Sequence, residues 1–189
     1  SFGSDLHEDC AELGNSAFDI APAVNILVTG AGAGVGQSII KAVKLSKHKT
    51  QLTTVDNSHL AAGLYRGDRT YLVPKYSEKG YIPRLIEICL KEDIDLIFAG
   101  TDVELEALSK HKKTIEGQTS TKVIVSGLKA IQIADDKWKT AEFLRKNRFP
   151  YPYSCITTSH SDLEKFNFPL IIKPRNGARS IGFKIIHST

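Results

Sequence analysis

The chain contains 189 residues, of which 41% are hydrophobic and 24% are charged, a balance typical of a folded globular protein. No apolar stretch approaches the roughly 18 residues that a membrane-spanning helix needs, so we expect no membrane partner. The net charge of +4 is too small to indicate a nucleic-acid partner. The densest basic cluster, residues 110–113, is predicted to be a solvated helix face.

The three cysteines, Cys10, Cys89 and Cys155, are far apart and odd in number, which argues against a disulfide framework and a zinc site. Cys89 stands in an apolar run and is expected to be a buried thiol. Because no secretory leader is recognisable, we expect a cytoplasmic protein. The sequence has no methionine, so residue 1 is not a translation start, and we expect a processed chain or an excised piece.

Residues 1–24 show no sustained hydrophobic period and are interpreted as a leader or tag remnant. From Asn25 onward, short apolar runs that predict strands alternate with amphipathic stretches that predict helices. Strands are expected at residues 25–29, 51–56, 70–74, 96–100 and 122–125, and helices at 37–45, 81–92 and 103–111. This alternation predicts a doubly wound parallel α/β sheet of the Rossmann-like type over residues 25–133.

The pattern changes at Asp135. A capped helix over residues 136–146 is followed by an extended segment that contains two prolines. Further strands are expected at 154–158, 170–173 and 183–186, with a short helix near 162–166. The last two strands flank a glycine-containing loop, residues 174–182, and should form a hairpin. Residues 134–189 are too few to bury a complete core, so we expect a truncated α+β lobe.

A glycine-rich loop, Gly30 to Gly36, stands between the first predicted strand and the first predicted helix. At this place in a Rossmann-like sheet, backbone N–H groups and the positive end of a helix face a phosphate. The GxGxxG spacing is not met, but the TGxxxGxG spacing is met and resembles that of the short-chain dehydrogenases. Asp56 follows about 20 residues later, where a ribose-binding acid would stand.

A dehydrogenase would also need a catalytic Tyr-x-x-x-Lys pair on a helix. The one match, Tyr71 and Lys75, falls in a strand-like segment that a proline interrupts. Three interpretations of the loop stay open: tight strand-to-helix packing alone, a dinucleotide site, and a site for a substrate or effector. Ligands of open α/β sheets gather at the carboxyl ends of the strands. The candidate substrate-binding residues there are Gly30, Gly32, Gly34, Thr101 and Glu104.

Two segments of the second half carry the most specific pattern. Asp136-Lys137 and a helix are followed by Phe-Pro-Tyr-Pro-Tyr-Ser at 149–154. Phe-Pro-Leu-Ile-Ile-Lys-Pro at 168–174 is followed by Gly-Ala-Arg-Ser-Ile-Gly-Phe at 177–183. These segments resemble the ATP-grasp superfamily with its preceding pre-ATP-grasp domain, nearest to the branch of carbamoyl-phosphate synthetase large chains and biotin carboxylases. The first unit also fits this branch, at residues 64–68 and 100–105.

The resemblance implies an ATP-dependent ligase that transfers the γ-phosphoryl group to a carboxylate or bicarbonate-like acid. An amine or another nucleophile then attacks the acyl phosphate. The resemblance places Lys173 on the α- and β-phosphates or near the adenine, and Lys137 toward the phosphates. The loop after Lys173 would fold over them with its backbone N–H groups. The implied ATP-binding residues are Lys137, Lys173, Gly177, Ala178, Arg179, Ser180 and Gly182.

The implied cofactors are ATP and Mg²⁺, and the implied partners are ATP and a small-molecule acid, with a homodimer left open. In the family, the metal ligands and the catalytic arginine stand further along the chain than Thr189. None of them is assigned here, and we expect no phosphoryl transfer by this chain alone. Two other functions stay open: an NAD(P)-dependent oxidoreductase that uses the Gly30 to Gly36 loop, and a non-catalytic nucleotide-sensing module.

Overall fold

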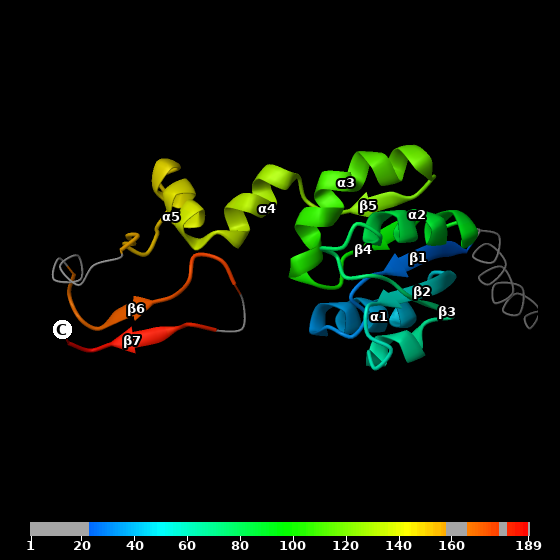
Figure 1. The fold of residues 1–189 in the computed structure, drawn as a ribbon, viewed down its shortest axis with the longest axis horizontal. Helices are drawn as coiled ribbons and strands as arrows, with labels where there is room; N and C mark the ends of the chain where they lie inside the picture. Colours follow the sequence, from blue (N-terminus) through cyan, green and yellow to red (C-terminus); the bar gives the residue numbers. More distant parts are fainter. Residues whose placement is uncertain (1–22, 158–165, 178–180, 189) are drawn as a thin grey trace, which may run out of the picture. The chain divides into compact units, whose positions relative to one another are not determined.

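A computed structural model describes residues 23–157, 166–177 and 181–188. These residues divide into two compact units between Val125 and Ser126 (Figure 1). The first unit is a sheet with helices, and the second unit consists of two helices and a β-hairpin.

The first unit is built on five strands. They are β1 (Val24–Val28), β2 (Thr50–Asp56), β3 (Arg69–Leu72), β4 (Leu96–Phe98) and β5 (Lys122–Ile124). Their order across the sheet is β3-β2-β1-β4-β5, and every neighbouring pair is parallel. The strand order reverses between β1 and β4, as in a doubly wound sheet. The predicted parallel α/β sheet is confirmed, and each strand begins and ends within two residues of its predicted bounds.

Helices cover both faces of this sheet (Figure 1). α1 (Gly34–Leu45) lies on one face, and α2 (Tyr81–Lys91) and α3 (Leu105–Gln118) lie on the other. Two short 3-10 helices, η1 (Ala62–Arg66) and η2 (Asp102–Glu104), follow β2 and β4. None of the helices in the described part of the chain has the length and apolar character that crossing a membrane would require.

α3 extends beyond its predicted end at residue 111. Leu108 and Ile115 stand seven residues apart on one helix face and are both fully buried, so the apolar stripe continues past the basic cluster. Within that cluster, Lys110 pairs with Glu106 across one helical turn. Lys112 pairs with Glu116 in the same way, which stabilises the added turns.

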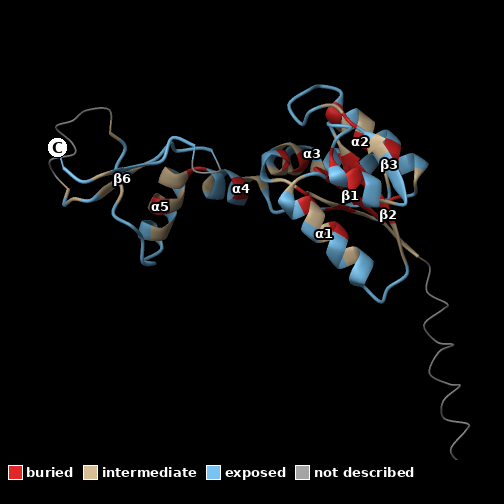
Figure 2. Cartoon of the chain, turned by 90° about the horizontal axis from the view of Figure 1, so that it is seen from below, coloured by how far each residue is buried: buried red, intermediate tan, exposed pale blue. Residues whose placement is uncertain are grey.

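Alternate residues of β1 pack into cores on the two faces of the sheet. Ile26 and Val28 pack with Ile40 of α1, whereas Leu27 belongs to the larger core with side chains of α2 and α3. This period of two follows from the pleat of a strand that is buried on both faces. Figure 2 shows the buried residues gathered along the strands and on the inner sides of the helices. Cys89 lies in the larger core, as predicted, and burial raises the pKa of its thiol.

The second unit contains α4 (Leu128–Asp135), α5 (Lys137–Lys146), β6 (Leu170–Ile172) and β7 (Lys184–Ile186). β6 and β7 pair in antiparallel fashion, with Ile171 directly opposite Ile185, so the predicted hairpin is confirmed. α4 is absent from the predicted elements, and it packs against α5. The structural division after Val125 therefore precedes the boundary at residues 133 and 134 that the sequence suggested.

The segment after α5 differs from its prediction. Residues 154–157 do not form a strand, although a strand was expected over residues 154–158. A strand needs a neighbour for its backbone hydrogen bonds, and in the described part of the second unit only β6 and β7 pair. Apart from Phe166, the predicted helix near 162–166 lies outside the described residues, as do residue 158 and residues 1–22.

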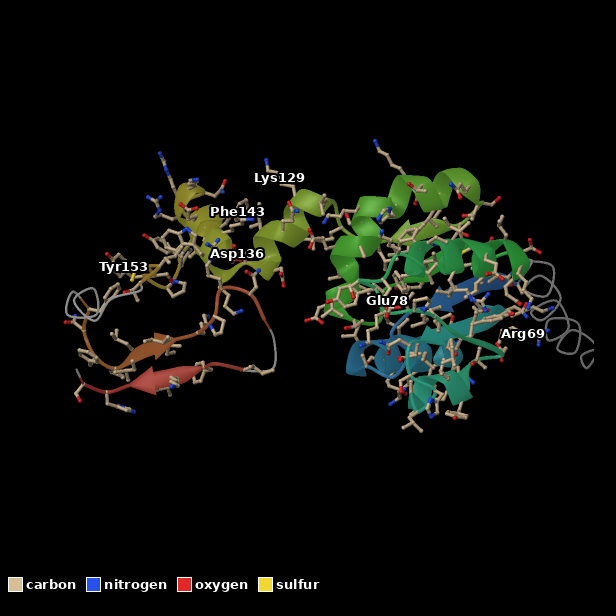
Figure 3. The ribbon with its side chains drawn as sticks, viewed as in Figure 1. Arg69, Glu78, Lys129, Asp136, Phe143 and Tyr153 are labelled. Atoms are coloured by element: carbon tan, nitrogen blue, oxygen red, sulfur yellow. The ribbon has the colours of Figure 1, made fainter. Side chains whose placement is uncertain are left out.

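Large apolar side chains are exposed in the second unit. Phe143, Tyr153 and Ile171 are 44%, 77% and 61% exposed, and the first two are labelled in Figure 3. Among the described residues of this unit, burial is confined to Ile131, Asp136 and Ala141. The second unit thus buries little apolar surface within its described residues (Figure 2).

Candidate functional site

The loop between β1 and α1 lies at the carboxyl edge of the sheet and is bound to both neighbouring strands. Gly30 follows β1 with a φ of +52°, a left-handed conformation that favours glycine. The Ala31 N–H donates to the Val55 carbonyl of β2 at 3.1 Å, and the Gly36 N–H donates to the Gly100 carbonyl after β4 at 2.9 Å. The loop is therefore fixed at the point where the strand order reverses.

Two glycines at this edge are explained by backbone packing. A Cβ on Gly36 would lie 2.4 Å from the carbonyl oxygen of Gly30, and one on Gly100 would lie 1.9 Å from the carbonyl oxygen of Thr29. Both distances are far below van der Waals contact, so residues without a side chain are required here. At Gly34, by contrast, no atom lies within 4 Å of the Cβ position. Tight packing thus accounts for Gly36 and gives no role to Gly34.

Asp56 is bound to the glycine loop itself. Its Oδ2 accepts a hydrogen bond from the Gly32 N–H at 2.8 Å, and its Oδ1 accepts one from the Ser58 N–H at 3.0 Å. Both carboxylate oxygens therefore accept from backbone N–H groups, and the Gly32 N–H is occupied. This arrangement weighs against a dinucleotide site in which Asp56 would bind a ribose and the loop would bind a phosphate.

Tyr71 does not form the pair with Lys75 that a dehydrogenase would need. It lies in β3, and its hydroxyl donates a hydrogen bond to the Glu92 carboxylate. The ammonium of Lys91 and the guanidinium of Arg84, both on α2, lie over its ring at 5.0 and 5.6 Å from the centroid. These contacts give Tyr71 a structural role.

Glu104 and Thr29 form a buried polar pair beside the loop. Glu104 is 7% exposed, and its Oε2 accepts a hydrogen bond from the Thr29 hydroxyl at 2.7 Å. Burial raises the pKa of the Glu104 carboxyl, and the hydrogen bond from Thr29 opposes part of that rise. The buried Tyr81 hydroxyl lies near the same carboxylate without a hydrogen bond of good geometry to any described residue. Burial and the Glu104 charge raise the pKa of Tyr81.

The structure brings three of the five candidate substrate-binding residues together. A Cβ on Gly30 would lie 2.7 Å from Thr101 Cγ2 and 3.1 Å from Glu104 Oε2, so these three residues are neighbours. Gly32 and Gly34 lie further along the loop and are exposed. The candidate set therefore consists of a buried part and a solvent-facing part.

In the second unit, the candidate nucleotide-binding residues come from the start of α5 and the loop after β6. Lys137 begins α5, and its ammonium donates to the carbonyls of Gly177 at 2.9 Å and Arg175 at 3.3 Å. Lys173 directly follows β6, is exposed, and makes no hydrogen bond or ion pair with another described residue. Lys137 is thus hydrogen-bonded to the loop, whereas Lys173 stands where the loop begins, directly after β6.

Asp136, which stands before α5 (Figure 3), has two kinds of partner. It caps the helix, since its Oδ1 accepts from the N–H groups of Trp138 and Lys139 at 3.0 and 3.2 Å. It also forms an ion pair that was not predicted, with Arg175 Nη2 2.5 Å from its Oδ2. This guanidinium lowers the pKa of Asp136 to about 2. An Asp before a helix can be recognised in a sequence, but a partner in a distant loop cannot.

The glycines of the β6–β7 loop have left-handed backbones. Gly177 has a φ of +118° and Gly182 a φ of +74°, conformations that residues with a side chain rarely adopt. Both residues are exposed. Ala178, Arg179 and Ser180, which were also predicted to bind ATP, lie outside the described residues.

Comparison with known proteins identifies the family. Residues 26–124, more than half of the chain, match the family described as the PylC-like N-terminal domain. The chain belongs to this family. Residues 26–124 are a pre-ATP-grasp domain, and the resemblance to the ATP-grasp superfamily is confirmed.

Two curated relatives are similar in sequence to part of this chain. The carbamoyl-phosphate synthase of Methanobrevibacter smithii is 28% identical over 124 residues, which are 64% of this chain and 33% of that protein. The D-alanine–D-alanine ligase A of Bacillus cereus is 29% identical over 117 residues, which are 55% of this chain and 39% of that protein. The chain thus spans less than half the length of either relative.

Solved structures share the fold of this chain over most of its length. The N5-carboxyaminoimidazole synthetase of Staphylococcus aureus, complexed with ADP, is similar with a TM-score of 0.67 and 18% identity, over 87% of this chain and 42% of that one. The biotin carboxylase domain of the Hydrogenobacter thermophilus 2-oxoglutarate carboxylase gives a TM-score of 0.63 and 19% identity, over 86% and 37%.

Replacing Gly36 by alanine should destabilise the pre-ATP-grasp domain by at least about 1–3 kcal/mol, because the new Cβ would overlap the Gly30 carbonyl. Gly34→Ala is the matched control. It meets open space in the first turn of the same helix and should change stability by less than about 1 kcal/mol, in the stabilising direction. Urea unfolding measures both, and equal effects would contradict the packing role of Gly36.

Glu104→Gln should alter how stability depends on pH. Since burial raises the pKa of Glu104, its charged form is disfavoured in the folded state, and stability falls as the pH rises from the ordinary glutamic acid range through the raised pKa. The glutamine cannot ionise, yet its amide oxygen can still accept from Thr29. We therefore expect a smaller fall in melting temperature toward neutral pH. An unchanged profile for Glu104→Gln would refute the burial effect.

Proposed function

We propose that the chain is the N-terminal portion of an ATP-dependent ligase of the ATP-grasp type. The reaction would activate a carboxylate or bicarbonate-like acid as an acyl phosphate, which an amine or another nucleophile attacks. The observation that carries this proposal is the presence of Lys137 and Lys173 at one loop of an ATP-grasp chain. The relatives support it, since a carbamoyl-phosphate synthase and a D-alanine–D-alanine ligase are both similar to this chain.

Lys173 is proposed to contribute most to the binding of the triphosphate. Its ammonium has no partner among the described residues, so its three N–H donors can all turn to phosphate oxygens. The ammonium of Lys137 already donates to two loop carbonyls, which leaves it one donor besides its charge. Backbone N–H groups of the loop from Gly177 to Gly182, including Ala178, Arg179 and Ser180, are proposed to complete the site.

The chemistry explains why cations are needed there. In phosphoryl transfer, negative charge spreads over the oxygens of the transferred group, so catalysis consists mainly of positioning and cationic stabilisation. The two lysines would hold the nucleotide in place. For Mg²⁺, the described residues contain no group of three or more His, Cys, Asp or Glu side chains that could bind it. We assign neither metal ligands nor catalytic residues to the described residues. The family resemblance, in which these residues stand further along the chain, is the reason that we propose no phosphoryl transfer by this chain alone.

The acid substrate is proposed to bind at the carboxyl edge of β1 and β4, where open α/β sheets bind their ligands. Gly32 and Gly34 are exposed there, and Thr101 is half-buried. Gly30 and Glu104 are buried beside them. These two residues would support the surface from below rather than touch the acid. Glu104 would do so through the hydrogen bond that it accepts from Thr29.

Replacing Lys173 by alanine in the full-length protein should weaken ATP binding about ten- to a hundred-fold, since a charge-assisted contact to phosphate is worth roughly 1.5–3 kcal/mol. Lys113→Ala, an exposed lysine of α3, is the control and should leave the ATP affinity unchanged. Lys173→Arg should recover part of the loss, because the charge is kept while the geometry differs. Calorimetric titration of ATP measures all three variants.

An ATP affinity of Lys173→Ala within about two-fold of the wild-type value would show that Lys173 does not bind the phosphates. A protein that binds ATP through these lysines but never consumes it, with any acid and amine tested, would be a nucleotide-sensing module instead. Product formation, followed as release of phosphate, separates a ligase from such a module.

Titration with NAD, NADP and their reduced forms should show no binding, because Asp56 and the Gly32 N–H are already paired with each other. Asp56→Ala should lower the melting temperature, since it leaves the N–H groups of Gly32 and Ser58 without their acceptor. Tight binding of a nicotinamide cofactor that Asp56→Ala abolishes would instead establish the oxidoreductase interpretation.

A further inference from the structure

Three consecutive residues at the start of α5 are joined to three consecutive residues of the β6–β7 loop. The Lys137 N–H donates to the Arg175 carbonyl at 3.0 Å. The Asn176 side-chain amide donates to the Asp135 carboxylate at 3.1 Å. Together with the Asp136–Arg175 ion pair, these bonds define a contact that we name the loop anchor, residues 135–137 and 175–177.

The ion pair is the strongest element of the loop anchor. Arg175 Nη2 lies 2.5 Å from Asp136 Oδ2, and Arg175 Nε donates to Asp136 Oδ1 at 3.2 Å. The two contacts use both carboxylate oxygens, which is the geometry in which an Arg–carboxylate pair is strongest and most directional. The Asp136 side chain is only 7% exposed, whereas the Arg175 side chain is 47% exposed.

Capping of α5 does not require this ion pair. An N-cap needs a side-chain oxygen that accepts from the first N–H groups, and serine or asparagine serves as well as aspartate. The charge of Asp136 is therefore not explained by the cap alone. Through the ion pair with Arg175, it fixes the β6–β7 loop that contains Arg175.

The loop anchor lies beside both lysines of the proposed nucleotide site. Lys137 is adjacent to Asp136 in the chain, and Lys173 is two residues before Arg175. Fixing Arg175 on Asp136 therefore fixes the two backbone segments that carry the lysines. Asp136 also compensates the charge of Arg175, which leaves Lys137 and Lys173 without an acidic partner among the described residues of the site.

We propose that Asp136 and Arg175 are a positioning pair that sets the spacing of Lys137 and Lys173 for one triphosphate, and that Arg175 is not itself a phosphate ligand. This inference rests on the proposed binding of ATP. The lowered pKa of Asp136, about 2, means that its carboxylate stays charged at neutral pH.

The test compares three variants and one control variant of the full-length protein in their binding of ATP and of adenosine. Asp136→Asn keeps the cap of α5 but removes the charge, and Arg175→Gln removes the other partner. Each should weaken ATP binding about ten-fold and leave adenosine binding unchanged, since adenosine has no phosphates. Arg175→Lys keeps the charge without the two-pronged geometry and should recover part of the loss. Arg145→Gln, at the exposed end of α5, is the matched control and should change neither affinity.

The double variant Asp136→Asn with Arg175→Gln distinguishes positioning from direct contact. If the pair acts as one unit, the double variant binds ATP no more weakly than either single variant. If Arg175→Gln weakens ATP binding and Asp136→Asn does not, Arg175 is a phosphate ligand and the inference is wrong. Equal ATP affinities of the wild type and all variants would also overturn it. A wild-type protein that does not bind ATP would overturn the proposed function itself, which is a different result.

Discussion

The close approach of the backbone after β4 to the first turn of α1 determines the geometry of the first unit. The Gly36 N–H donates to the Gly100 carbonyl at 2.9 Å, and a Cβ at Gly100 would lie 2.9 Å from the Cα of Gly36. Because neither residue has a side chain, the first turn of α1 packs directly against the backbone that follows β4. The intervening loop must then turn sharply, which requires the left-handed backbone of Gly30. The same closure brings Thr101 and Glu104 beside Gly30.

The sequence predicted those elements whose pattern is local. The five strands of the first unit are short runs bounded by glycine, proline or polar residues. The inner strands β2, β1 and β4 are buried or half-buried along their length, whereas the edge strands β3 and β5 are mostly exposed. The cap of α5 is equally local, since it lies within a few residues of Asp136. The strand expected at 154–158 depended on a neighbour that the local sequence does not contain. α4 was missed because its eight residues are too few to show a clear helical period, although five of them are apolar.

For the candidate site, the sequence located residues but not their partners. Lys137 and Lys173 were identified by position in a motif, yet the loop carbonyls around the Lys137 ammonium become visible only in three dimensions. Asp56 stands where a ribose-binding acid would be expected, whereas in the structure its carboxylate accepts a hydrogen bond from the glycine loop. One signal for this was present: Asp56 and Ser58 have the spacing at which an aspartate accepts from the N–H two residues on. The Arg175 partner of Asp136 had no such signal.

The register of the β6–β7 hairpin also bears on the solubility of the protein. Ile171 and Ile185 stand opposite each other and are 61% and 52% exposed, while Leu170 and Ile186 form the next pair, on the other face. The ribbon is therefore apolar on both faces, and within the described residues neither of its outer edges has a strand partner. A ribbon of two strands is marginally stable in water, and bare apolar edges are where chains join one another. Within the described residues, this exposed apolar hairpin is therefore a surface through which copies of the chain would associate as their concentration rises.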